Sequence, residues 1–545
     1  MKKYKILFVL SGAAAGCSVH EKQKFQLPEK PNILIISCED ISPDLGCYGN
    51  KLVKTPNLDR LAAEGLRFTQ AFTTAGVSAP SRCAMITGMY ASGIGGNCMR
   101  TSAKNLPDGI PPYEAVPPAD VKCYSELLRK AGYYCTNNEK TDYQFTSPIT
   151  AWDECSRQAH WRNRPKGKPF FAIFNIITTH ESQISYRKNS PLSYHDKDVS
   201  IPPYYPDDSI VRRDIARNLS NITVMDREAG MILQQLKDDG LYDSTIIIFY
   251  SDHGGPLPRQ KREVVESGTH IPLIIRLPKA QLAGTVIDEL VSMVDLPPTI
   301  LSLAGIKKPS YMQGQIFLGP HKEKPREYVF AARDRMDTEY DMVRSVRDKK
   351  YLYVRNFHPE LPYYQNIQFR INNIPMMKRL LELKEAGKLD SLQMIWFAPT
   401  KPAEQLYDVE NDPHTLYDIA AKPENAAIVK RMRKVLDRWM KDINDQGLNK
   451  DGSLKTEKQL VWEMWPGGVQ PVTEKPQISL KNNVATITCN TTGASIAYQI
   501  NGKGLNEKHW FLYSAPVALN KGDTLTAVAI RIGYKQSEKS EIVYQ

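Results

Sequence analysis

Hydrophobic residues in the first half of the chain occur in short continuous runs and not in alternation with polar residues. The stretches 31–37, 168–180 and 245–250 each contain such a run and end in polar residues. Continuous apolar runs of this length are typical of strands buried on both faces of a parallel sheet. Apolar positions recur with helical spacing at 55–65 and 211–236. The pattern therefore predicts an α/β fold with a mostly parallel central sheet.

The pattern changes at about residue 327, where short apolar stretches follow one another without long helices between them. This change predicts a small antiparallel sheet, which a helix at 426–443 closes. A linker follows residues 465–468, and after it apolar and polar positions alternate between Gly and Asn turns, which predicts an appended β-sandwich. We expect three folded parts, at 31–326, 327–460 and 470–545.

Residues 1–17 carry the pattern of an export signal. Three lysines precede the apolar run 6–10, and small residues lead from there to Cys17. The run is too short to cross a bilayer as a stable helix. Because it ends in Gly-Cys, the segment resembles a bacterial lipoprotein signal, in which Cys17 would become the lipidated first residue. We expect an exported protein that is periplasmic or anchored to the membrane through this lipid alone.

Composition narrows the possible partners. With 545 residues, 41% of them hydrophobic and 24% charged, the chain is long enough for at least two domains with ample core material. The net charge of +11 suits a polyanionic partner such as a sulfated glycan, and equally a merely basic surface. Lys and Arg are nowhere dense enough to indicate a nucleic-acid-binding tract. The cysteines after Cys17 form no Cys-x-x-Cys pair, so no zinc or redox motif is present and any disulfide pairing stays open.

The stretch from Ser78 to Gly88 lies where a helix is expected to begin. Pro80 and Ser81 favour a helix start, so Ser78 would face the positive end of the helix dipole, where an anion can bind. An ordinary Ser-Pro turn that opens a helix is the alternative. The pattern Ser-x-Pro-Ser-Arg-x-x-x-Ile-Thr-Gly resembles the signature of the type I sulfatases. This resemblance implies that an anaerobic-type maturation enzyme oxidises Ser78 to formylglycine (3-oxoalanine), and that Arg82 fixes this group.

Pairs of candidate metal ligands follow two of the predicted strands. Glu39 and Asp40 come directly after the first apolar run, and Asp252 and His253 come after the third. Adjacent acids repel each other, so they either point apart into solvent or are held by a cation. The resemblance implies one calcium ion at Glu39, Asp40, Ser78, Asp252 and His253. Calcium prefers oxygen ligands, so His253 is expected at the edge of the metal or beside formylglycine.

Four cationic side chains are candidates for binding substrate. The resemblance places Lys140 in a second sulfatase signature, in which Asp142 stands where the family has a histidine. It also places His180 and Lys261 against the sulfate or the ester oxygen. Without the resemblance, Lys140 would be a solvated surface lysine and His180 a structural histidine. Arg333 is either a glycan contact or one half of a structural ion pair.

The resemblance to type I sulfatases covers about residues 31–446 and implies an alkaline-phosphatase-like sandwich. The Glu-Asp pair and the segment 256–269 look closest to N-sulfoglucosamine sulfohydrolases. That likeness implies hydrolysis of sulfate esters or sulfamates on glycosaminoglycan-type amino sugars. Residues 474–545 resemble the small β-sandwich appended to chitobiase-type enzymes. Two alternatives stay open: a phosphoester or phosphonate hydrolase of the same superfamily, and a non-catalytic glycan-binding lipoprotein.

Overall fold

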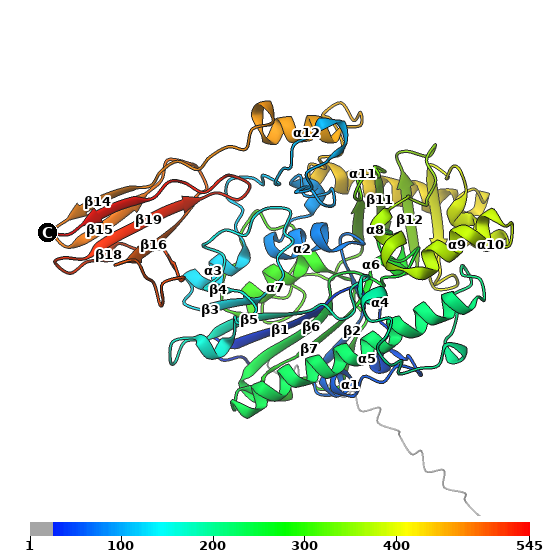
Figure 1. Cartoon of the computed structure of the whole chain (residues 1–545), viewed down its shortest axis with the longest axis horizontal. Helices are drawn as coiled ribbons and strands as arrows, with labels where there is room; N and C mark the ends of the chain where they lie inside the picture. Colours follow the sequence, from blue (N-terminus) through cyan, green and yellow to red (C-terminus); the bar gives the residue numbers. More distant parts are fainter. Residues whose placement is uncertain (1–25) are drawn as a thin grey trace, which may run out of the picture.

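The computed structural model describes residues 26–545, and a nine-stranded sheet forms its centre (Figure 1). The predicted export signal and Cys17 lie outside the described residues. The strand order is β4-β3-β5-β1-β6-β7-β2-β8, with β9 paired to β2. The strands are β1 (Asn32–Cys38), β2 (Leu66–Phe72), β3 (Tyr134–Asn138), β4 (Glu154–Cys155), β5 (Phe170–Ile176), β6 (Thr245–Ser251), β7 (His270–Arg276), β8 (Thr285–Ile287) and β9 (Val291–Ser292).

The central sheet is mostly parallel, as predicted. Neighbouring strands from β4 to β6 run parallel, and β7 runs antiparallel to both of its neighbours, β6 and β2. Both faces are buried, which explains why the strand sequences are continuously apolar. Leu34 and Ile36 pack on one face, while Ile33 and Ile35 pack on the other. The first face is covered by α1 (Pro56–Ala63) and α5 (Ser209–Asp238), and the second by α2 (Ser78–Thr87), α3 (Tyr124–Lys130) and α7 (Leu296–Leu303).

The register of the central strands brings three loops together. β1 lies between β5 and β6 and is parallel to both, so Cys38 pairs with Ile176 on one side and with Ser251 on the other. The segments that follow these three strands therefore leave the same edge of the sheet. In open α/β sheets this carboxyl edge is where ligands bind. The topology thus places all three polar strand ends at one site.

A second, antiparallel sheet follows, as predicted from the shorter apolar stretches. Its strands are β10 (Val329–Arg333), β11 (Val343–Arg347), β12 (Tyr351–Asn356) and β13 (Glu404–Asp408), and α11 (Ala426–Asp442) packs on it. The insertion between β12 and β13 is helical. It contains α8 (Gln368–Asn373), α9 (Pro375–Glu385) and α10 (Ser391–Met394).

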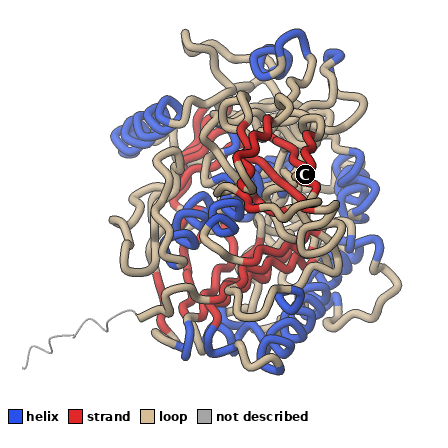
Figure 2. Tube along the Cα trace, turned by 90° about the vertical axis from the view of Figure 1, so that its left-hand side faces the viewer, coloured by secondary structure: helices blue, strands red, loops and turns tan. Residues whose placement is uncertain are grey.

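The C-terminal part extends away from the central sheet, and Figure 2 views the molecule from this end. After α12 (Glu457–Met464), two antiparallel sheets enclose a small core of their own. Lys122 contacts Ser495, and His509 lies 2.9 Å from Asp153, so the sandwich is held against the central domain by polar contacts. Its strands are β14 (Gln477–Lys481), β15 (Val484–Thr488), β16 (Ser495–Ile500), β17 (Phe511–Leu512), β18 (Val517–Ala518), β19 (Thr524–Ile530) and β20 (Ser540–Val543).

Residues 26–545 contain neither disulfide bonds nor candidate membrane-spanning helices. All eight cysteines of this region are free thiols, and five of them are buried: Cys38, Cys83, Cys98, Cys123 and Cys135. Across the same residues, helices long and apolar enough to cross a bilayer are absent.

Candidate active site

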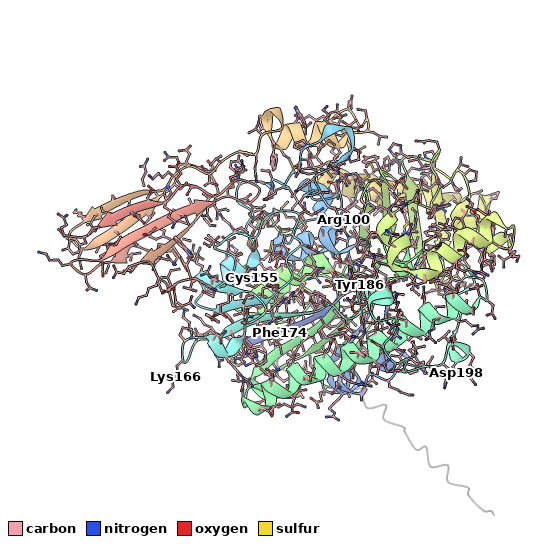
Figure 3. The ribbon with its side chains drawn as sticks, in the orientation of Figure 1. Arg100, Cys155, Lys166, Phe174, Tyr186 and Asp198 are labelled. Carbon is pink, nitrogen blue, oxygen red and sulfur yellow. The ribbon has the colours of Figure 1, made fainter. Side chains whose placement is uncertain are left out.

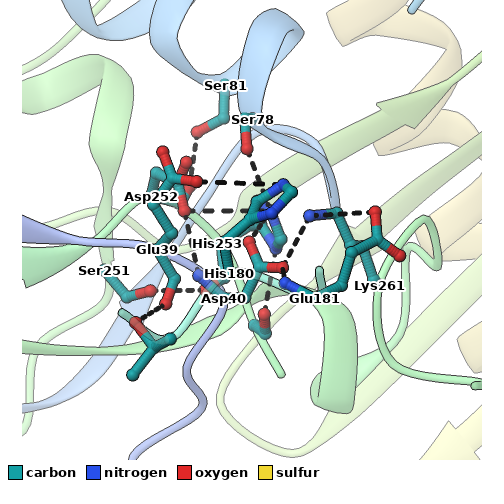
Figure 4. Close-up of polar contacts among 12 residues, drawn as sticks. Glu39, Asp40, Ser78, Ser81, His180, Glu181, Ser251, Asp252, His253 and Lys261 are labelled. Atoms are coloured by element: carbon teal, nitrogen blue, oxygen red, sulfur yellow. Dashed lines mark hydrogen bonds and ion pairs between the residues drawn. The ribbon is translucent and has the colours of Figure 1, made fainter. Parts of the chain in front are cut away.

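Ser78 is the first residue of α2 and lies almost fully buried at the carboxyl edge of the sheet. Val77 precedes it in extended conformation and supplies no side-chain cap, so the first N–H groups of the helix lack a side-chain acceptor there. The hydroxyl of Ser78 lies 3.3 Å from Nε2 of His253 (Figure 4). A helix N-terminus favours negative charge. Ser78 therefore stands where an attacking group would meet an anion.

The predicted metal ligands converge opposite Ser78. Potential ligand atoms of Asp40, Asp252 and His253 lie within 4.8 Å of one another, and so do those of Glu39, Asp40 and His180. The backbone N–H of Asp40 donates to Oδ1 of Asp252 at 3.2 Å, which joins the ends of β1 and β6. The three carboxylates and His253 are buried. Such a cluster is stable only if positive charge compensates it.

His253 supplies an argument that this cluster fits a cation. Its Nδ1 lies 2.9 Å from the carbonyl of Gly254, and since a carbonyl only accepts, Nδ1 donates. In neutral His253 the lone pair of Nε2 is then directed at Oδ1 of Asp40, 3.0 Å away. Two lone pairs at this distance repel unless a proton or a metal ion lies between them. Among the described residues, Oδ1 of Asp40 and Oε2 of Glu39 are also buried without a hydrogen-bond donor, so both have room for a cation.

Arg82 braces the acidic side of the site. Its Nε donates to Asp252 at 3.1 Å, and its Nη2 donates to Glu39 at 3.2 Å. Its Nη1 donates to Asn175 of β5 at 2.9 Å. Burial alone would lower the pKa of Arg82, but Asp252 and Glu39 outweigh it and raise that pKa. Its hydrogen bonds reach the carboxylates and Asn175 and do not reach Ser78, so Arg82 positions the two carboxylates.

Lys140 lies at the cleft and is shared between two acids. Its Nζ is 2.8 Å from Glu39 and 3.2 Å from Asp142, and about a quarter of its side chain is exposed. Asp142 has a left-handed backbone, with φ of 48°. Its ion pair is with Lys140, so in this structure Asp142 orients the lysine. Asp142 forms no hydrogen bond with Ser78 among the contacts of the described residues. It therefore does not replace the family's histidine through a direct contact with Ser78.

The resemblance gives Lys140 a sulfate-binding role, so we expect Lys140→Met to lower kcat by about 10²- to 10³-fold, the loss typical of one charge-stabilising donor. Asp142→Asn should lower kcat by only about 10-fold, because Lys140 keeps its contact with Glu39 and loses one partner. Steady-state kinetics of the matured protein measure both values. Equal losses in the two variants would instead assign Asp142 a direct part in the reaction.

His180 and Lys261 approach the cluster from the other side of the cleft. The backbone N–H of Ser182 donates to Nδ1 of His180 at 3.3 Å, so neutral His180 carries its proton on Nε2. Burial and the charge of Lys261 lower the pKa of His180, which favours this neutral form. Lys261 lies 2.6 Å from Asp40 and 3.3 Å from Glu181. Burial would lower the pKa of Lys261, but these two carboxylates raise it.

Glu181 is a buried site residue that the sequence did not reveal. Its two oxygens accept from Nη1 and Nη2 of Arg262 at 2.9 and 2.8 Å, and one of them also lies near Lys261. Its backbone N–H donates to Asp40 at 2.8 Å. The one available signal was its place directly after His180 at the end of an apolar run. Glu181 therefore ties the lysine to the metal-ligand cluster.

The structure places Arg333 outside this site. Its guanidinium donates to Glu263 at 2.8 Å and to Asp341 at 3.1 Å, and the side chain is buried. It lines a separate cavity of about 50 Å³ together with Lys401. Of the two roles that the sequence allowed for Arg333, the structure supports the structural ion pair and not the substrate contact.

One open cleft of about 450 Å³ lies over the cluster. Ser78, Lys140, His180 and Lys261 line it, and Asp142 and Glu181 also contribute. Further along the cleft, the wall is formed by residues from the loop after α2 and by α8 of the insertion. The cleft thus joins a buried anion-binding end to an open end that can admit a larger molecule.

Comparisons with known proteins agree with this geometry. A family model described as Sulfatase matches residues 31–157 and 134–306, and a model described as "N-sulphoglucosamine sulphohydrolase, C-terminal" matches residues 259–369. An "Ulvan-active sulfatase" of Formosa agariphila is 46% identical over 95% of this chain and 92% of its own length. The human "N-sulphoglucosamine sulphohydrolase" is 26% identical over 76% of this chain and 90% of its own. A solved 2-O GAG sulfatase shares the fold, with a TM-score of 0.57 and 19% identity over 79% of this chain and 96% of that one.

Proposed function

We propose that this chain, which belongs to the sulfatase family, hydrolyses sulfate groups on sulfated glycans. In this proposal it uses a formylglycine made from Ser78 and one calcium ion. The family makes the chain a sulfuric ester hydrolase. One observation carries the finer proposal: Ser78 opens a buried helix directly opposite a cluster of carboxylates and cations. Relatives named for ulvan and for N-sulphoglucosamine support a sulfated glycan as the substrate class.

Calcium would be held by Glu39, Asp40, Asp252, His253 and the group at position 78. When bound, such an ion polarises the sulfate oxygens and stabilises their charge. Hard oxygen ligands form most of this set, which suits calcium better than zinc.

The charge balance of the site also favours a divalent cation. Five carboxylates (Glu39, Asp40, Asp142, Glu181 and Asp252) are joined to four cations (Arg82, Lys140, Lys261 and Arg262) by ion pairs and hydrogen bonds. By themselves these groups leave one negative charge in excess, which would repel a sulfate. A divalent ion turns that excess into one positive charge, which attracts it.

Formylglycine would supply the nucleophile, because its hydrated form attacks sulfur with one hydroxyl and expels sulfate with the other. The side chains of the chain then have separate tasks. Arg82 holds Glu39 and Asp252 in place. Lys140 and Lys261 stabilise charge on the peripheral oxygens.

The departing oxygen needs a proton, and the cleft offers two donors. Nε2 of neutral His180 can donate a hydrogen bond to that oxygen, while Lys261 holds a proton on Nζ. Lys261 is an ammonium group with three protons on Nζ, whereas neutral His180 has a single N–H and loses it less readily. Lys261 therefore has the proton to transfer and His180 orients the oxygen that receives it.

Comparing sulfate and phosphate esters tests this function against the phosphohydrolase alternative. Matured protein should hydrolyse a sulfated oligosaccharide or an aryl sulfate with a kcat/KM on the order of 10²-fold or more above that for the matching phosphate ester, because the site balances a monoanion better than a dianion. Mass spectrometry of the peptide spanning residue 78 shows whether the protein is matured. A preference for phosphate would favour the phosphohydrolase. Protein that keeps an unmodified Ser78 even in the presence of a maturation enzyme, and that binds sulfated glycan without turnover, would favour the non-catalytic alternative.

A further inference from the structure

A ladder of alternating charges leads from the buried end of the cleft to its mouth. Lys261 lies 3.3 Å from Glu181, and both oxygens of Glu181 accept from Arg262. Nη2 of Arg262 lies 3.8 Å from Asp337, and Nε of Arg100 lies 2.5 Å from the other oxygen of Asp337. These five residues, which we call the charge ladder, come from four distant segments of the chain.

Arg100 ends the ladder at the surface. About 42% of its side chain is exposed, against 2% for Lys261 and Arg262. Its Nε is engaged by Asp337, whereas neither Nη has a hydrogen-bond acceptor among residues 26–545. The two Nη groups form the end-on fork that matches the two oxygens of a carboxylate or a sulfate. Arg100 thus keeps its most selective donors free in the cleft.

Arg100 is the cation of the ladder that meets solvent. Lys261 is paired with Asp40 and Glu181, and Arg262 is paired with Glu181, so the buried members leave no positive charge in excess. The guanidinium of Arg100 is therefore the positive group that an anion meets at the open end of the cleft. Low-dielectric walls strengthen such a charge for an approaching anion.

Phe369 gives the exposed end a defined shape. The guanidinium of Arg100 lies over the ring of Phe369, 4.9 Å from its centroid. The same ring lies 6.3 Å from that of His180, in an edge-on arrangement. Phe369 belongs to α8 and lines the cleft, and Figure 3 shows Arg100 in this region between the central domain and the insertion helices. The stacked pair is therefore continuous with the reacting end of the cleft.

The backbone supports a binding role for this pair. Arg100, Arg262 and Asp337 have φ values of 59°, 76° and 53°, all in the left-handed region. This region is unfavourable for residues other than glycine and persists where surrounding structure holds it, often at ligand-binding sites.

We propose that Arg100, stacked on Phe369 and oriented by Asp337, forms a second anion subsite, which binds a carboxylate or a second sulfate on the sugar next to the one that is desulfated. The inference rests on the proposed function and narrows its substrate class to glycans with two anionic groups within the length of the cleft. Sulfate at Ser78 and the second anion at Arg100 would bind at the same time. Arg100 then selects the substrate and leaves the chemistry to the buried end.

The test compares three oligosaccharides that differ at one group. The first has a uronic acid next to the sulfated sugar, and the second is the same compound with its carboxyl group reduced to an alcohol. The third has a second sulfate in place of the carboxylate. Matured wild-type protein should favour the carboxylate compound over the reduced one by about 10- to 100-fold in kcat/KM, the effect of one charge-assisted bidentate contact. A preference for the doubly sulfated compound by a similar factor would identify sulfate as the occupant.

Arg100→Gln should bring this ratio close to one, and Arg100→Lys should restore part of it, because lysine keeps the charge without the fork. The matched control is Arg157→Gln, since Arg157 is 84% exposed, pairs with Glu139 and lies outside the cleft lining. The control should keep the wild-type ratio. If Arg100→Gln also keeps the wild-type ratio, the subsite is refuted. It is refuted as well if wild-type protein prefers neither the carboxylate compound nor the doubly sulfated compound over the reduced one.

Binding measurements separate this inference from the proposed function. Isothermal titration calorimetry of Ser78→Ala protein measures the Kd of the carboxylate and the reduced oligosaccharides without any turnover. The ratio of these two Kd values should show the same preference for the carboxylate compound. If matured protein cleaves none of the compounds but binding still depends on Arg100, the proposed function fails and the subsite stands. If turnover occurs and neither kinetics nor binding depends on Arg100, the subsite fails and the function stands.

Discussion

Ser78→Ala should abolish sulfate ester hydrolysis, with a loss in kcat on the order of 10⁴- to 10⁶-fold, as expected when the nucleophile of covalent catalysis is removed. Ser78 is buried at the start of α2, and its hydroxyl faces Nε2 of His253. The substitution removes only the side-chain oxygen, and because alanine is smaller than serine it introduces no steric clash. The fold should therefore be retained. Circular dichroism and thermal unfolding check the fold, and kcat for an aryl sulfate checks the reaction.

The matched control is Ser209→Ala. Ser209 is also the first residue of a helix, α5, but it is exposed and lies outside the cleft lining. This variant should keep full activity. Wild-type protein produced without a maturation enzyme should be as inactive as Ser78→Ala, and its peptide should be about two daltons heavier than the matured one, because oxidation of Ser78 removes two hydrogens. Full activity with an unmodified Ser78 would refute the formylglycine mechanism.

Asp252→Asn should lose both metal and turnover, with kcat reduced by about 10³-fold or more, since a bound cation contributes several kcal/mol to charge stabilisation. One oxygen of Asp252 accepts from Asp40 N–H and the other from Arg82, so the amide keeps the shape of the side chain but removes its charge and one of these two acceptors. Metal analysis measures the bound ion directly. Calcium should raise the melting temperature of wild-type protein and not that of the variant, because only the wild type binds it.

Chelation of wild-type protein should have the same effect, and calcium should restore activity better than zinc, because most of the ligands are hard oxygens. Asp207→Asn is the control, since Asp207 is exposed and pairs with Arg212 at the surface. It should keep metal and turnover. Normal activity in metal-free Asp252→Asn protein would remove the cation from the proposal.

The strands that build the site could be predicted because strands buried on both faces consist of consecutive apolar residues. β1, β5 and β6 are buried on both faces, so nearly every side chain must be apolar, and the polar residue that ends each run marks an edge of the sheet. Ser78 could be found in the same way, because a helix start and its signature lie within a few residues. The motifs therefore singled out Asp40, His180 and Asp252, whose side chains gather in one cluster, without any knowledge of strand order.

Strand order and side-chain partners could not be predicted in this way. Nothing local states that β1 lies between β5 and β6, yet this order alone brings Asp40 within hydrogen-bond distance of Asp252, 212 residues away. The same holds for Arg333, whose sequence position allows either a glycan contact or an ion pair. Its partners Glu263 and Asp341 decide the matter, and they belong to different parts of the fold.

The sequence by itself determined the family, the α/β class and most of the residues that the fold gathers at the cleft, because those features depend on local periodicity and on short motifs. Only the tertiary structure decided how each cation is held at the site and how far it is exposed. Lys140 and Lys261 look alike in the sequence, but Lys261 is buried between two carboxylates and Lys140 is partly exposed. Arg100 carries no local signal at all, since its ion-pair partner, 237 positions away, and the ring beneath it are brought close only by folding. Charge interactions act through space, so their partners are set by packing and not by distance along the chain.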